Sequence, residues 1–225
     1  MVKIVNFITT EINIISIPRD PINPSQVKID QLKGKIAELY EDSKVIVTQY
    51  PESLIIFDVN NQIGITIKKP ENRIIVRDIN VTPYSARDLE RFTRFVVEIH
   101  NFLGGREIIK YYGFNIHSIF DFENDIDDSG EFIKVNFIKA EKFNEADFGA
   151  MKSASLRVIN YKNNDGRYQL TIEPRFTKDL KPTKSMLISQ NAHFSNVLPN
   201  IVNLNEQCVK VYEDLKTKIV KLIES

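Results

Sequence analysis

One sequence feature constrains the possible folds of this chain more than any other. It is a series of four short runs that are rich in branched apolar residues and are separated by very short breaks. The runs cover residues 44–50, 53–59, 62–69 and 72–81, and the breaks between them carry the Pro, Glu and Asn that favour tight turns. Such short turns join antiparallel neighbours, because parallel strands need a crossover of about a dozen or more residues. The sequence therefore predicts a four-stranded antiparallel meander.

Alternating apolar residues predict more strands on both sides of this meander. They are expected at residues 2–17, 106–122, 131–139 and 184–192, with a hairpin over residues 155–174 that turns at Asn163-Asn164-Asp165-Gly166.

Three other segments, residues 24–41, 82–105 and 200–223, repeat their apolar residues at the spacing of a helix. In the second segment, Ser85 and Asp88 have the spacing of an N-terminal capping box. These elements predict an α+β fold, with about nine strands in one or two antiparallel sheets and three main helices packed on one face.

Residues 1–225 are expected to form a single compact α+β unit, with a candidate seam near residues 104–106 between two sheet-plus-helix halves. Cys208 lies on the apolar stripe of the last helix and is expected to be a small buried side chain.

Composition narrows the classes of function. The 30 basic and 30 acidic residues give a formal net charge of zero, which argues against a nucleic-acid partner and makes self-association easier. The one cysteine permits no internal disulfide, so a reducing compartment, the cytoplasm of a bacterium or archaeon, is expected. No stretch is long and apolar enough to predict a membrane span.

Two long segments carry a resemblance to a known family. They are "YSARDLERFTRFVVEIHNFLGGREIIKYYGFNIHSI", in which a helix passes into a strand, and the final helix "IVNLNEQCVKVYEDLKTKIVKLI". With the helix-then-meander order before them, they resemble a sporadically distributed family of uncharacterised bacterial proteins of about this length. In that family the strand often carries arginines around its glycine, whereas Tyr112 and Phe114 flank the glycine here. The resemblance implies a compact α+β protein and no particular activity, so it assigns no residue a role.

The acidic stretch "FENDIDDSGEF" is the first candidate site. Asp125, Asp127 and Ser129 stand at alternate positions before a glycine, as at the start of a calcium loop, and the main-chain carbonyl of Glu131 would be the next ligand. The position of the closing glutamate is taken by Asn136. The stretch is therefore either a calcium or magnesium site of another architecture or an acidic turn in water.

The strand before this stretch is the second candidate. With a period of two, Tyr111, Asn115, His117 and Asp121 share one face, and His117 would be the proton-transfer group because its pKa lies near neutrality. The alternative is the ordinary solvated face of an antiparallel sheet.

The leading hypothesis is a non-enzymatic binding or interaction module, without a cofactor, that holds a protein partner or another copy of itself by a sheet face or edge. A homo-oligomer is expected. The alternative is a divalent-metal-dependent hydrolase or nuclease that uses residues 121–131 with Tyr111, Asn115 and His117. A third hypothesis, a carrier of small ligands, requires a cavity between helix and sheet.

Overall fold

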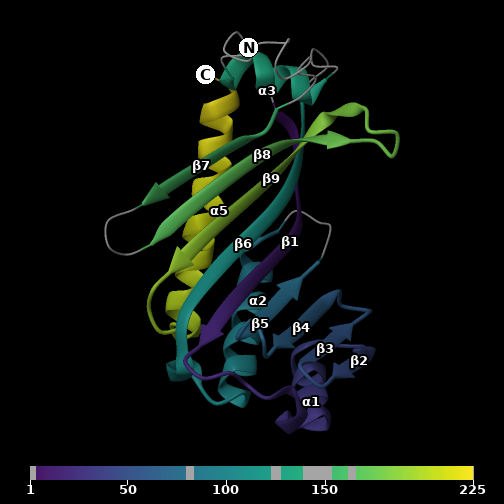
Figure 1. Cartoon of the computed structure of the whole chain (residues 1–225), viewed down its shortest axis with the longest axis vertical. Helices are drawn as coiled ribbons and strands as arrows, with labels where there is room; N and C mark the ends of the chain where they lie inside the picture. The colour runs from purple at the N-terminus through teal and green to yellow at the C-terminus, as the bar shows by residue number, and fades with distance from the viewer. Residues whose placement is uncertain (1–3, 80–83, 123–127, 139–153, 162–165, 225) are drawn as a thin grey trace.

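The computed structural model describes residues 4–79, 84–122, 128–138, 154–161 and 166–224. Within these ranges, nine strands form one antiparallel sheet in the order β2-β3-β4-β5-β1-β6-β9-β8-β7 (Figure 1). The strands are β1 (Ile4–Pro18), β2 (Val45–Tyr50), β3 (Ser53–Asp58), β4 (Ile63–Lys68), β5 (Arg73–Asp78), β6 (Ile109–Phe122), β7 (Leu156–Tyr161), β8 (Arg167–Phe176) and β9 (Pro182–Phe194). The predicted α+β class and the antiparallel meander are confirmed.

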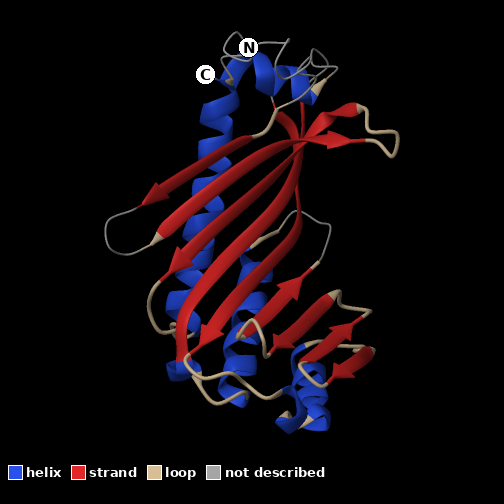
Figure 2. Cartoon of the chain, viewed as in Figure 1, coloured by secondary structure: helices blue, strands red, loops and turns tan. Residues whose placement is uncertain are grey.

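Helices cover one face of this sheet. The helical elements are η1 (Pro24–Gln26), α1 (Ile29–Leu39), α2 (Ala86–Phe102), η2 (Arg106–Ile108), α3 (Ser129–Phe137) and α5 (Ile201–Glu224). In Figure 2, α1, α2 and α5 lie behind the strands, and no described helix lies over the front face of the sheet. We call that front face the open face.

The N-terminal strand β1 lies at the centre of the sheet and joins its two halves. On one side Ile14 pairs with Val76 of β5, and on the other side it pairs with Phe114 of β6. Ile14 has no exposed surface, and Val76 and Phe114 are also buried. One hydrophobic core therefore extends over both halves of the sheet. At the candidate seam, Gly104 and Gly105 have φ angles of 124° and 99°, which glycine adopts without strain, and they turn the chain from α2 into η2.

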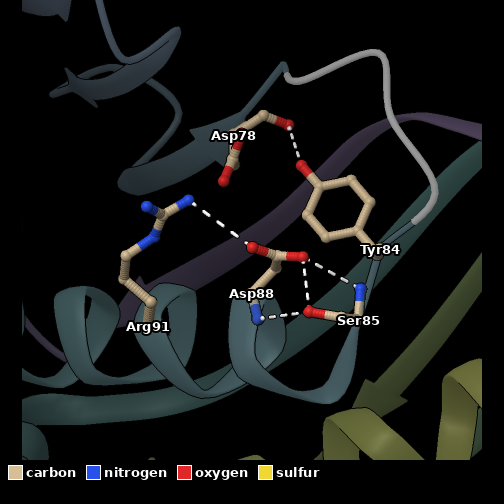
Figure 3. Close-up of polar contacts among 5 residues, drawn as sticks. All are labelled: Asp78, Tyr84, Ser85, Asp88 and Arg91. Atoms are coloured by element: carbon tan, nitrogen blue, oxygen red, sulfur yellow. Dashed lines mark hydrogen bonds and ion pairs between the residues drawn. The ribbon is translucent and has the colours of Figure 1, made fainter.

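The predicted capping box at the start of α2 is confirmed (Figure 3). The Asp88 N–H donates to Ser85 Oγ at 3.2 Å, and the Ser85 N–H donates to Asp88 Oδ2 at 3.0 Å. Asp88 also pairs with Arg91, at 3.7 Å between Oδ1 and Nη2. Just before the cap, the Tyr84 hydroxyl donates to the Asp78 carbonyl oxygen at 3.5 Å, which ties the end of β5 to the start of α2.

The apolar stripe predicted for the last helix is also confirmed, since Leu204, Cys208, Leu215 and Ile219 of α5 are buried. Burial raises the pKa of the Cys208 thiol far above its usual value, which keeps it protonated and unreactive.

The strand predicted at 131–139 is wrong, because this segment forms the helix α3. Asp128 caps the helix and accepts from the Glu131 N–H at 2.9 Å. Ile133 is fully buried, and α3 packs against β8 and β9, whereas Val135 is exposed. The helix cap and the packing of α3 at the end of the sheet therefore outweigh the preference of this alternating sequence for a strand.

The first helix is shorter than predicted. A separate 3-10 turn, η1, forms at Pro24–Gln26, and α1 begins only at Ile29.

Candidate functional site

The polar face predicted for the strand before the acidic stretch lies on the open face of the sheet. Tyr112 of β6 donates a hydrogen bond to Gln207 of α5, at 2.5 Å, so the even-numbered side chains of β6 point to the helices. Tyr111, Asn115 and His117 alternate with them and lie on the opposite side.

A row of amides crosses the open face at the level of Asn115. The register of the sheet places side by side Asn13 of β1, Asn115 of β6, Asn191 of β9 and Gln169 of β8, which we call the amide row. Asn13 and Asn115 are only 6% and 8% exposed, although they lie on the open face.

Hydrogen bonds give the amide row a direction. Asn13 Nδ2 donates to Glu11 Oε1 at 2.8 Å, Asn115 Nδ2 donates to Asn13 Oδ1 at 2.7 Å, and Asn191 Nδ2 donates to Asn115 Oδ1. The Glu11 carboxylate can only accept, so it fixes the orientation of each amide in turn. Bonds aligned in this way polarise and strengthen one another.

The row is interrupted between its last two members. Asn191 Oδ1 is buried and has no hydrogen-bond partner in the described part of the chain. Gln169, its neighbour in the register, instead accepts from Arg157 Nη2 at 2.8 Å through Oε1. A buried acceptor without a partner costs free energy, so a donor at this place would stabilise the row.

A shallow polar pocket of about 290 Å³ lies at this interruption. Its lining includes Asn115, His117, Arg167, Gln169, Ser189 and Asn191. Arg167 makes no ion pair with a described residue, so the lining has a cation, several amides and no carboxylate.

His117 lies beside a serine on the open face. His117 Nδ1 lies 2.9 Å from Ser189 Oγ. Glu11 is the register partner of His117, but its carboxylate accepts from Asn13 and makes no ion pair with the imidazole. Among the described residues, no carboxylate therefore orients His117 as a base for Ser189, as the third group of a catalytic triad would.

Tyr111 lies apart from this pocket. Its ring centroid is 5.9 Å from that of His193, and Lys110 Nζ is 4.8 Å from the Tyr111 ring centroid. The three residues of the sequence hypothesis thus share a face, but only Asn115 and His117 line the pocket.

The described residues of the acidic stretch do not line the pocket either. Asp125 and Asp127 lie outside the described residues. Ser129 is fully buried at the start of α3, and Glu131 pairs with Lys134 in the same helix. Asp121, on the open face of β6, accepts from Asn6 and Ser185. Within the described ranges, no group of three or more His, Cys, Asp or Glu side chains is placed to hold a metal ion.

The other half of the open face is apolar. Five half-buried side chains of β1, β3 and β5 lie there, which we call the apolar patch: Ile15, Ile17, Ile55, Phe57 and Ile75. The patch continues to the edge strand β2, where Ile46 is 54% exposed and pairs with Phe57 in the register.

One arginine lies between the apolar patch and the amide row. Arg77 is the register partner of Asn13, and its guanidinium carbon lies 5.8 Å from the centroid of the Phe57 ring. Gly64 makes this possible, because a Cβ there would be 3.0 Å from the Phe57 ring and 3.2 Å from Arg77 Nε.

The sequence hypothesis missed both the amide row and the apolar patch. The members of the amide row are far apart in the chain, and the pairing of β1 with β6, β6 with β9 and β9 with β8 brings them together. The apolar patch depends in the same way on the pairing of β1 with β5 and on the meander. The sequence does hold one signal for the apolar patch. Runs such as residues 74–76 are apolar at every position, whereas a strand with one solvated face needs an apolar residue only at every second position.

The fold and this face define an antiparallel α+β protein with an open, partly apolar sheet surface. No protein-family model matches the chain, and no curated protein matches its sequence. In the described ranges, no helix combines the length and apolarity that crossing a bilayer requires.

Proposed function

We propose that this protein is a non-enzymatic binding module that holds a protein partner against the open face of its sheet, and that a second copy of the chain is the first such partner. The observation that carries the proposal is the apolar patch on a face that no described helix covers.

An antiparallel sheet with one solvated face normally alternates apolar residues inside with polar residues outside. β1, β3 and β5 depart from this rule, because Ile15, Ile55 and Ile75 are apolar on the outer side as well. Ile15 and Ile75 are neighbours on this face, and Thr66 of β4 lies between Ile75 and Ile55. An exposed apolar surface of this kind is typical of interaction sites.

The surroundings of the patch match the composition of protein interfaces, in which aromatic residues and arginine are enriched and a polar rim surrounds an apolar centre. Phe57 and Arg77 supply the aromatic ring and the arginine at the border of the patch. The amide row supplies polar groups beside them.

The edge strand β2 supports self-association. Its six residues, "VIVTQY", include no charged residue and no proline, the features that usually protect a sheet edge. The zero net charge of the chain adds no long-range repulsion between copies.

We also propose that the protein works in a reducing prokaryotic cytoplasm. The buried, unpaired Cys208 supports this proposal, since secreted proteins more often place their cysteines in disulfides.

The test is sedimentation velocity over a range of concentrations, with Ile55→Lys as the disrupting variant. The matched control is Val202→Lys, which adds the same charge at a 65% exposed position of α5 in the helix layer. We expect concentration-dependent association of the wild type that Ile55→Lys abolishes and Val202→Lys retains, with the same circular dichroism for all three.

Cross-linking in host extract is the second readout, for a partner other than the chain itself. If Ile55→Lys changes neither self-association nor any cross-link that Val202→Lys retains, the open face is not a binding surface and the proposal is wrong.

A further inference from the structure

A second candidate site lies on the other side of the sheet, between the C-terminal half of α5 and the strands β7, β8 and β9. It is a cleft of about 380 Å³, within the range of small-molecule sites. The lining includes Val158, Tyr168, Leu170, Gln190, Lys218 and Leu222. None of these residues belongs to the apolar patch, but Gln169 of the amide row also lines the cleft, and Gln190 also lines the polar pocket.

The walls of the cleft are mainly apolar. Val158 and Leu170 are register partners on β7 and β8, and Leu222 comes from α5. Such walls favour an apolar body, because binding removes its methylene groups from water.

Two lysines of α5 give the cleft a positive border. Lys221 lines it and makes no ion pair with a described residue. Lys218 lies with its Nζ 5.6 Å from the centroid of the Tyr168 ring and 3.7 Å from Asp214 Oδ2. Two ammonium groups beside one carboxylate leave an excess of positive charge for an anionic group.

Gln190 adds a polar group on the sheet side. Its side chain is 4% exposed and makes no hydrogen bond with a described residue. Its register partners are Leu170 and Ile116, so apolar residues flank it on both neighbouring strands. The amide is therefore a polar group among apolar neighbours that lines the cleft, where a ligand can supply a hydrogen-bond partner.

We infer that this cleft binds a small amphipathic carboxylate. The carboxylate is held by the ammonium groups of Lys218 and Lys221, and the apolar body lies against Val158, Leu170 and Leu222. A further hydroxyl or carbonyl group on the body pairs with the Gln190 amide. The cleft shares no residue with the apolar patch, so the inference does not require a partner bound there.

The experiment is isothermal titration of the full chain with three probes of the same chain length: decanoate, ω-hydroxydecanoate and decylammonium, all below their micellar concentrations. We expect saturable binding of both carboxylates, tighter for the hydroxy acid, and no saturable binding of the cation.

The variants separate the parts of the site. The double variant Lys218→Gln/Lys221→Gln should weaken both carboxylates by about tenfold or more, because it removes charge-assisted bonds. Lys210→Gln, an exposed position on the same helix, is the matched control and should change nothing. Gln190→Leu should keep decanoate binding and remove the roughly fivefold preference for the hydroxy acid.

The inference is overturned if no carboxylate binds saturably, or if decylammonium binds as tightly as decanoate. Equal weakening by the control and by the double variant would also overturn it, since binding would then depend on surface charge alone. An unchanged preference in Gln190→Leu would refute the role of the amide.

Discussion

Gly166 packs directly against the main chain of His193, so closely that a Cβ at Gly166 would lie 2.6 Å from the His193 carbonyl oxygen. The contact lies where β8 begins to pair with β9, next to the register pair of Arg167 and His193. We predict that Gly166→Ala lowers the free energy of unfolding by about 1–3 kcal/mol, because a backbone atom cannot rotate out of the way. Urea denaturation measures this, and an unchanged midpoint would contradict it.

At Gly34 we predict that the same change, from glycine to alanine, stabilises the protein. Gly34 lies exposed inside α1, and a Cβ there would meet no atom within 4 Å. Gly34→Ala should therefore raise the free energy of unfolding by about 0.5–1 kcal/mol, since alanine loses less backbone entropy in a helix. The same urea series serves, and destabilisation would show that α1 contacts something at this position.

Asp58 organises the corner where β3 ends. Its Oδ1 accepts from the N–H groups of Lys44, Asn60 and Asn61, and its Oδ2 accepts from Ser43 Oγ at 2.6 Å and Asn61 Nδ2 at 2.9 Å. Burial works to raise the pKa of Asp58, but the hydrogen bonds outweigh it and hold the pKa below its usual value.

Asp58→Ala leaves these donors without their acceptor and should destabilise the fold by about 3 kcal/mol or more. Asp179→Ala, in an exposed turn, is the control and should change stability by less than about 0.5 kcal/mol. Thermal unfolding compares the two, and similar losses would mean that the network around Asp58 contributes little.

His100 predicts a dependence of stability on pH. It is fully buried in α2, its Nδ1 donates to the Val96 carbonyl oxygen at 2.7 Å, and burial lowers the pKa of His100 to about 4. The folded state therefore keeps His100 neutral, whereas the unfolded state binds a proton below about pH 6.5. The contribution is full above that pH and is lost as the pH falls toward 4, by about 3 kcal/mol in total.

The variant His100→Gln is neutral at every pH and isolates this effect. Denaturation at about pH 7.5 and about pH 4.5 should show a larger acid-induced loss in the wild type than in the variant. Equal losses in both proteins would show that other groups, such as the carboxylates, cause the acid sensitivity.

Gln190 links stability to the cleft beside α5. Its side chain is only 4% exposed and its register partners Leu170 and Ile116 are apolar, so Gln190→Leu should raise the free energy of unfolding by about 1 kcal/mol. Chemical denaturation of the ligand-free protein tests this. A destabilised variant would mean that the amide already has a partner in the folded protein.

Local patterns predicted most of the fold. Turn residues fixed the meander, the pair Ser85 and Asp88 marked the start of α2, and the stripe containing Cys208 marked α5. The prediction for residues 131–139 was wrong because their alternating apolar residues favour a strand. The helix α3 forms there because Asp128 caps it and Ile133 is buried at the end of the sheet, a position that the local sequence does not reveal.

The site could be predicted only in part, for a related physical reason. A period of two placed Asn115 and His117 on one face of a strand, and this much follows from the sequence. Their neighbours Asn13 and Asn191 come from strands about 100 and 76 residues away, and no local preference encodes that register.

The position of β1 has a consequence for how the chain is made. Ile14 is synthesised before both of its partners, Val76 and Phe114, so one edge of β1 stays without its neighbour until β6 has been synthesised. Pairing over such distances slows folding, and an unpaired isoleucine-rich strand can pair with other chains. While the chain is being synthesised, β1 therefore needs protection from pairing with other chains, although it lies at the centre of the sheet in the folded protein.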